Sequence, residues 1–123
     1  MDDGKKTVLA VDDVPFFLNR LKTMLKDTPY KLVCLTSGKV ALDYIAENRP
    51  ALFLLDIEMP EMDGYELARK IRENGHTAPI IYLTGNDSQE YLDKAMAAGA
   101  SDFIVKTFGQ LDIVEKIDKY IQP

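Results

Sequence analysis

Five short apolar segments recur along the chain, and each is followed by a stretch with helical spacing. The segments run from Val8 to Val11, Leu32 to Leu35, Ala51 to Leu55, Ile80 to Leu83 and Phe103 to Val105. Their apolar residues are nearly continuous rather than alternating, which is typical of strands covered on both faces in a parallel sheet. The pattern predicts a β-α unit repeated five times, and therefore an α/β fold whose parallel sheet lies between layers of helices.

The expected helices are recognised by the spacing of their apolar residues and by the residues at their starts. Leu18, Leu21 and Leu25 illustrate the spacing, which places them on one helical face. Pairs three residues apart mark three helix starts, as in a capping box: Asp63 with Glu66, Asp87 with Glu90, and Thr107 with Gln110. No internal repeat or low-complexity stretch interrupts the series, so we expect residues 1–123 to form one domain.

Composition and charge then narrow the function classes. The 123 residues carry a net charge of -5, which argues against binding to nucleic acid because no basic excess is present to neutralise phosphates. The first residues are polar and charged, and no apolar stretch approaches the ~20 residues needed to cross a bilayer. We therefore expect a soluble, cytoplasmic protein that contacts neither membrane nor nucleic acid directly.

Cysteine and histidine contribute little to the predicted chemistry. The single cysteine, Cys34, excludes an internal disulfide and lies within an apolar run, where a small buried side chain is expected. His76 is the only histidine and lies in the turn after Gly75, so we expect a solvated loop residue. It lacks the partners that a zinc site requires.

Polar side chains stand at the ends of four of the five predicted strands: Asp12 and Asp13, Asp56, Thr84, and Lys106. In open α/β sheets, ligands bind outside the carboxyl ends of the strands. Each residue alone has an ordinary explanation, since a lone Asp after a strand is often a turn former or a helix cap, and a lone Lys is often a solvated surface residue. Their occurrence together at one edge favours a functional site.

The chemistry of these residues points to phosphoryl transfer. Three converging carboxylates repel one another, and a divalent cation removes that cost. Oxygen ligands favour Mg²⁺, which often shares its coordination shell with phosphate. Lys106 supplies a compact positive charge for a phosphate oxygen, and Thr84 supplies a hydroxyl donor. An Asp carboxylate is a nucleophile for phosphoryl groups, so the predicted product is an aspartyl phosphate.

With these residues in place, the chain resembles the receiver domain of two-component response regulators. The resemblance covers essentially the whole chain and rests on four pieces: Asp12-Asp13, the run from Leu54 to Gly64 that contains Asp56 and Met59-Pro60-Glu61-Met62-Asp63-Gly64, Thr84-Gly85, and Phe103-Ile104-Val105-Lys106. It implies a flavodoxin-like three-layer α/β/α sandwich with five parallel strands in the order 2-1-3-4-5.

The resemblance also implies a role for each site residue. Asp56 would be the phosphoacceptor, and Thr84 and Lys106 would contact the phosphoryl oxygens. Mg²⁺ would be held by Asp12, Asp13, Asp56 and the backbone carbonyl of Glu58. Phe103 would be the aromatic switch residue that turns inward when Thr84 moves toward the phosphate, although a plain core role for Phe103 is compatible with this.

The implied partners are those of a signalling module rather than of a turnover enzyme. A histidine kinase or a phosphotransfer protein would donate the phosphoryl group. A downstream protein or effector domain would then bind the face around the fourth and fifth helices, where Tyr91 and Lys94 lie. A dimer that forms on phosphorylation is a further option, and the resemblance does not decide whether the domain stands alone or belongs to a longer regulator.

Three positions depart from the commonest pattern of the family. Thr107 follows Lys106 where the family usually has Pro. The Lys106–Thr107 peptide is therefore either cis, at a cost of ~3 kcal/mol, or trans with a different approach of Lys106. Glu58 places another carboxylate near the metal, where its side chain would affect either metal affinity or the lifetime of the phosphoryl group. Asn86 occupies another position where the family tunes that lifetime, and the direction of these effects stays open.

Two rival functions use the same residues differently. A phosphatase of the haloacid dehalogenase type also uses a strand-end Asp, Mg²⁺, a Thr and a Lys. It needs a second Asp two residues after its nucleophile, and this chain has Glu58 there. An interaction module that has lost phosphorylation is the second rival, and the complete set of polar residues argues against such a loss.

Overall fold

The strands form one parallel sheet between two layers of helices. The computed structural model describes residues 4–85, 89–97, 100–106 and 109–122. The sheet has the order β2-β1-β3-β4-β5. Its strands are β1 (Lys6–Val11), β2 (Tyr30–Leu35), β3 (Leu52–Asp56), β4 (Ile80–Thr84) and β5 (Asp102–Val105). The helices are α1 (Pro15–Leu25), α2 (Gly38–Ile45), α3 (Gly64–Glu73), α4 (Gln89–Ala97) and α5 (Gln110–Tyr120). The predicted fold class and strand order are confirmed.

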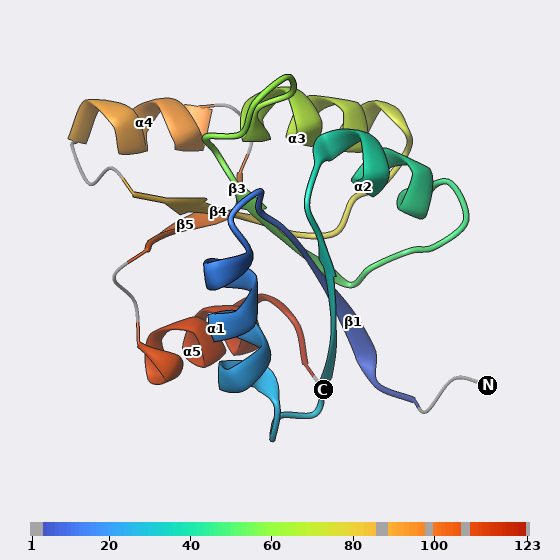
Figure 1. The fold of residues 1–123 in the computed structure, drawn as a ribbon, viewed down its shortest axis with the longest axis vertical. Coiled ribbons are helices and arrows are strands. Elements are labelled where there is room, and N and C mark those ends of the chain that lie inside the picture. The colour runs from blue at the N-terminus through green and yellow to red at the C-terminus, as the bar shows by residue number, and fades with distance from the viewer. Residues whose placement is uncertain (1–3, 86–88, 98–99, 107–108, 123) are drawn as a thin grey trace.

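Helices cover both faces of the sheet and divide its core into two clusters. Figure 1 shows α1 and α5 on one face, with α2, α3 and α4 on the other. Buried residues of β1, β3 and β4 point alternately into the two clusters, so Leu54 packs with Leu21 of α1 while Phe53 packs with Leu67 of α3. Burial on both faces explains why the strand segments are continuously apolar. The described helices include none that is long and apolar enough to span a membrane.

The predicted helix starts have different outcomes. Asp63 caps α3 as expected, because its Oδ1 accepts a hydrogen bond from the Glu66 N–H at 2.9 Å. The prediction for α5 was wrong in position: the capping residue is Gly109, whose N–H donates to Asp112 Oδ2 at 3.0 Å. The Asp112 carboxylate thus caps the start of its own helix by accepting the Gly109 N–H, and no Ser or Thr side chain is needed. The third predicted cap, Asp87, lies outside the described residues.

His76 is buried, so the prediction of a solvated loop residue was wrong. Only 4% of its surface is exposed, and its Nε2 lies 3.0 Å from the carbonyl oxygen of Ile45. Because a carbonyl oxygen only accepts, this ring nitrogen carries the proton and donates. The ring also meets Phe53 edge-on, with centroids 6.0 Å apart. A satisfied hydrogen bond and an aromatic contact explain how this polar side chain fits under α2.

The strand register brings the predicted site residues to one edge. Val11 of β1 pairs with Leu55 of β3, so the next residues, Asp12 and Asp56, leave the sheet side by side. On the other side of β3, Thr84 of β4 pairs with Val105 of β5, and Lys106 follows directly. The strand order reverses between β1 and β3, which is where doubly wound sheets place their ligands. The fold therefore directs these side chains to a single location.

The loop after β3 packs closely against that location. A Cβ built on Gly64 would lie 2.4 Å from the Asp56 carbonyl oxygen and 2.8 Å from the Cα of Ile57. The Gly64 N–H donates to the Ile57 carbonyl at 2.8 Å, which holds the start of α3 against the end of β3. Because both neighbouring atoms belong to the backbone, no side-chain rotation could relieve the contact.

We therefore expect Gly64→Ala to lower the free energy of unfolding by about 1–3 kcal/mol through overpacking. Gly85→Ala is the matched control, since a Cβ at Gly85 would meet no atom of the described residues within 4 Å, its chain neighbours aside. The control should change stability by a few tenths of a kcal/mol or raise it slightly. Urea denaturation of the three proteins measures both effects, and equal midpoints for Gly64→Ala and the unsubstituted protein would contradict the close approach.

Candidate functional site

Asp12, Asp13 and Asp56 form a carboxylate cluster at the carboxyl edge of β1 and β3. Each offers one oxygen, and these oxygens all lie within 4.8 Å of one another. Asp12 is fully buried and Asp56 is 2% exposed, whereas Asp13 is half-buried. The Asp12 backbone N–H donates to the Leu35 carbonyl at 3.1 Å, and its Oδ1 accepts from the Val14 N–H at 2.9 Å. The backbone thus fixes Asp12 where the chain turns from β1 into α1.

Lys106 provides the positive charge opposite this cluster. Its Nζ lies 3.0 Å from Asp12 Oδ2 and 3.0 Å from Asp56 Oδ1, and its side chain is only 12% exposed. The backbone of Lys106 is held as well, because its N–H donates to the Thr84 carbonyl at 2.7 Å. One ammonium therefore bridges the carboxylates that end two neighbouring strands.

The pKa values of Asp56 and Lys106 are both raised in this cluster. Burial raises the pKa of the Asp56 carboxyl to about 7, and the charge of Asp12 adds to this while Lys106 opposes it. Burial acts to lower the pKa of the Lys106 ammonium, but its hydrogen bonds to Asp12 and Asp56 outweigh that effect, and the pKa is raised. At neutral pH the Lys106 ammonium is therefore charged.

The cluster offers the oxygen ligands of a candidate divalent cation site. All three side chains offer oxygen, which Mg²⁺ and Ca²⁺ prefer. Asp13 Oδ1 is buried and accepts no hydrogen bond from any residue that the structure describes. A buried acceptor without a donor is costly, and a bound cation would remove that cost. Lys106 already occupies one oxygen each of Asp12 and Asp56, so the cluster retains acceptor capacity on its remaining oxygens.

The structure also describes Thr84, Phe103 and Glu58, three other predicted site residues. Thr84 ends β4 and is 1% exposed. Phe103 of β5 is half-buried and packs against the core cluster on the α2 and α3 face, opposite Tyr82 in the register. Glu58 follows β3 in the loop and its side chain is exposed. Asn86 and the Lys106–Thr107 peptide lie outside the described part of the chain, so their predicted effects stay predictions.

Sequence reasoning missed two residues of α1 that contact Lys106. The Lys106 Nζ lies 4.2 Å from the centroid of the Phe17 ring. Arg20 Nη1 donates to the Lys106 carbonyl at 3.3 Å. A signal was available in the sequence, because a helix that starts immediately after Asp12-Asp13 must run beside the same edge of the sheet. Its first inward-facing aromatic residue is Phe17.

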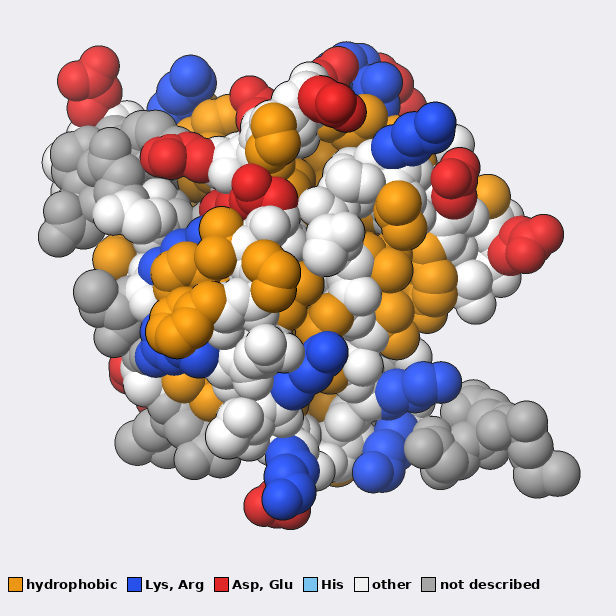
Figure 2. Space-filling view, in the orientation of Figure 1, with side chains coloured by type: hydrophobic (Ala, Val, Ile, Leu, Met, Phe, Trp, Pro, Cys, Tyr) orange, Lys and Arg blue, Asp and Glu red, His pale blue; other side chains and the backbone are white. Residues whose placement is uncertain are grey.

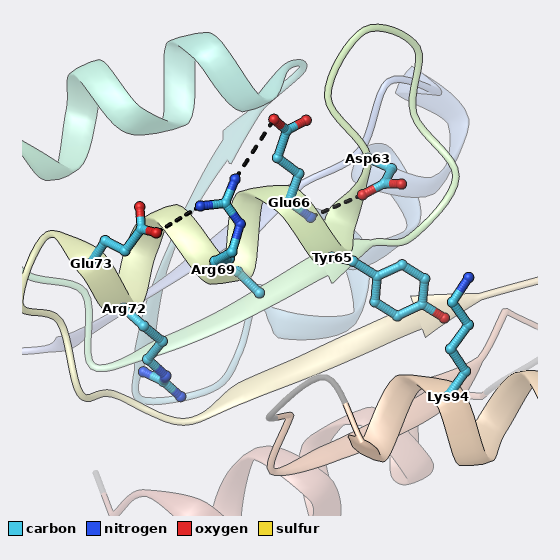
Figure 3. A pocket seen from close by; sticks show the side chains of 8 residues that line it. Asp63, Tyr65, Glu66, Arg69, Arg72, Glu73 and Lys94 are labelled. Carbon is cyan, nitrogen blue, oxygen red and sulfur yellow. Dashed lines mark hydrogen bonds and ion pairs between the residues drawn. The ribbon is translucent and has the colours of Figure 1, made fainter.

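A hollow of about 860 Å³ lies on a different surface, between α3 and α4. Figure 3 shows Tyr65 of α3 pointing toward Lys94 of α4, while Arg69 joins Glu66 and Glu73 along α3. The Lys94 Nζ lies 5.1 Å from the centroid of the Tyr65 ring. None of the three clustered carboxylates lines this hollow, so it is separate from the site.

Comparison with known proteins agrees with the geometry. Residues 8–118 match the family described as the response regulator receiver domain. The response regulator protein TmoT of Ectopseudomonas mendocina is 31% identical over 95% of this chain and 53% of its own length. The response regulator MprA of Mycobacterium sp. is 34% identical over 89% of this chain and 48% of its own length. The chain thus spans about half the length of these relatives.

Solved structures share the fold at lower identity. The Vibrio cholerae chemotaxis response regulator CheY4 superposes with a TM-score of 0.86 at 27% identity, covering 95% of this chain and 99% of that one. The receiver domain of a Pseudomonas aeruginosa sensor histidine kinase has a TM-score of 0.85 at 28% identity, covering 95% and 98% of the two chains. Its structure contains magnesium coordinated in the active-site cleft. From its sequence match and its site geometry, this chain belongs to the response regulator receiver domain family.

Proposed function

We propose that this chain is a phosphoacceptor module of a two-component response regulator, with Asp56 as the residue that carries the phosphoryl group. The observation that carries the proposal is the position of Asp56. It is a buried carboxylate, bridged by Lys106 to Asp12, and the nearby Asp13 Oδ1 accepts no hydrogen bond from the described residues. The donor is a histidine kinase or a phosphotransfer protein.

The proposed reaction needs little more than positioning and charge neutralisation. An oxygen of the ionised Asp56 attacks phosphorus, and a new O–P bond forms. The bond between phosphorus and the donor nitrogen breaks, and the leaving imidazole keeps the electron pair. Lys106 releases its contact with Asp56 Oδ1 and offers the same ammonium to a phosphoryl oxygen. The Thr84 hydroxyl, at the adjacent strand end, is the proposed second donor to that group.

The proposed metal site consists of Asp12, Asp13, Asp56 and the backbone carbonyl of Glu58. When bound there, Mg²⁺ would neutralise the charge that the carboxylates and the incoming phosphoryl oxygens bring together. Asp12 and Asp13 hold their oxygens at the end of β1, and Asp56 contributes from β3. The magnesium reported for the P. aeruginosa relative supports this choice of cation.

The proposed output is a change on the face formed by α4, β5 and α5. Thr84 and Phe103 lie on the neighbouring strands β4 and β5. Phe103 pairs with Tyr82, two residues before Thr84 on β4. A shift of Thr84 toward the phosphoryl group leaves room for Phe103 to turn further inward, which alters the surface that a downstream protein reads. Lys94 of α4 is exposed, whereas the Tyr91 side chain is not among those that the structure describes.

Family membership favours this signalling role over the rival phosphatase. Glu58 stands where the phosphatase needs an Asp, and its side chain is exposed to solvent. The proposed module promotes its own phosphorylation and dephosphorylation without turning over an external substrate. Retention of Asp12, Asp13, Thr84 and Lys106 also argues against a module that has lost phosphorylation.

We expect incubation with acetyl phosphate and Mg²⁺ to add one phosphoryl group, measured by intact mass. Asp56→Asn should give no adduct because the nucleophilic oxygen is lost. Lys106→Ala should slow adduct formation by at least about tenfold, since one charge-assisted contact in the transition state is removed. Asp43→Asn, which changes an exposed carboxylate on α2, is the matched control and should behave like the unsubstituted protein. An adduct on Asp56→Asn would exclude Asp56 as the acceptor.

We also expect the metal-free protein to depend on pH through Asp56. Its pKa of about 7 lies above the ordinary value, so the folded protein binds the proton more tightly than the unfolded chain. The free energy of unfolding, relative to that of Asp56→Asn, should therefore rise as the pH falls from about 8 to about 5, by on the order of 2–4 kcal/mol.

Thermal and urea unfolding of both proteins across this pH range measures the difference. Saturating Mg²⁺ should flatten it, because the cation favours the ionised form of Asp56. A difference between the two proteins that stays constant with pH would show that Asp56 is not desolvated in the folded state.

A further inference from the structure

Lys106 is held at both of its ends by α1. Its ammonium lies 4.2 Å from the centroid of the Phe17 ring, in addition to its contacts with Asp12 and Asp56. Its backbone carbonyl accepts a hydrogen bond from Arg20 Nη1 at 3.3 Å. The helix that follows the first two aspartates therefore reaches across to the residue that ends β5.

The contact with Phe17 restricts where the ammonium can lie. A lysine stem has four rotatable bonds, so two carboxylates alone leave the ammonium free to swing outward. The face of an aromatic ring is negative and attracts a cation, most strongly where water is excluded. The Lys106 side chain is only 12% exposed, so the Phe17 ring acts on a largely desolvated charge.

The contact with Arg20 restricts the backbone at the same residue. Arg20 lies over the exposed ring of Phe16, with its guanidinium carbon 6.0 Å from the ring centroid. The Phe16 and Phe17 rings meet edge-on with centroids 5.4 Å apart. Figure 2 shows hydrophobic side chains gathered over the start of α1 beside basic groups. The Phe17 ring thus contacts the Lys106 ammonium directly, and the Phe16 ring packs against the Arg20 side chain that binds the Lys106 carbonyl.

Thr107 follows Lys106 in the sequence, so the backbone of Lys106 is not restricted by a proline and depends on other contacts. Proline would lock its own backbone and restrict the residue before it, but the chain has Thr107 there, which imposes no such restriction. The Lys106 N–H is fixed by the Thr84 carbonyl, and the Arg20 hydrogen bond fixes the carbonyl at the other side of the same residue.

We propose that Phe17 and Arg20 are positioning residues for phosphoryl transfer to Asp56: Phe17 holds the Lys106 ammonium at the acceptor carboxylate, and Arg20 holds the backbone from which that side chain extends. The contacts described above lead from both residues to Lys106, so we assign them a role that acts through Lys106. This inference rests on the proposed function of Asp56.

The test compares Phe17→Leu and Arg20→Met with the unsubstituted protein. The rate constant for adduct formation from acetyl phosphate at saturating Mg²⁺ should fall roughly three- to tenfold in each variant. The Mg²⁺ dissociation constant should stay within about twofold, because the carboxylate cluster is unchanged. Phe17→Tyr retains an aromatic face and should recover most of the rate. Arg69→Met makes the same side-chain change on α3, far from Lys106, and serves as the control.

A second measurement separates positioning from a general structural effect. In a Lys106→Ala background, Phe17→Leu and Arg20→Met should cause no further loss of rate, because the group they position is gone. Additional losses as large as those seen with Lys106 present would overturn the inference, and so would unchanged rates in the single variants. If the unsubstituted protein formed no adduct, the proposed function would fail together with this inference. An adduct at equal rates in all variants would overturn the inference alone.

Discussion

Mutual repulsion among three carboxylates, relieved by a single ammonium, is the constraint on which the rest of the structure depends. Asp12 and Asp56 are buried, and Lys106 bridges them at 3.0 Å on each side. One ammonium cannot neutralise three carboxylates. Burial raises the pKa of the Asp56 carboxyl to about 7, and the charge of Asp12 adds to this rise while Lys106 opposes it. Among the described residues, no donor reaches the buried Asp13 Oδ1, which supports the proposal of a bound cation at this cluster.

The fold supplies the rigidity that this arrangement requires. The parallel pairing of Val11 in β1 with Leu55 in β3 places Asp12 beside Asp56. Gly64 packs against the carbonyl of Asp56 from the other side, and α1 holds Lys106 through Phe17 and Arg20. Rigid strand ends carry the charges, while the helices and loops around them set the distances.

The sequence was sufficient to predict the sheet, its helices and the gathering of the carboxylates, because continuous apolar strands and their polar end residues are local patterns. The Asp63 cap was equally local. His76 was not predictable, since its burial depends on the Ile45 carbonyl, 31 residues away. The contacts of Phe17 and Arg20 with Lys106 were missed for the same reason: a helical pattern shows which face is apolar, but not which distant residue it meets. The start of α5 was misplaced because Asp112 ties the Gly109 N–H from within the helix.

Cation binding tests the central claim most directly. Titration of the isotope-labelled protein with Mn²⁺, followed by paramagnetic broadening of backbone amides, locates bound metal without any phosphodonor. One saturable site is predicted, with broadening centred on Asp12, Asp13 and Asp56 and abolished by Asp13→Asn. Broadening centred instead on the exposed carboxylates of α3, Glu66 and Glu73, or no saturable binding, would contradict a cation site at the carboxyl edge of β1 and β3.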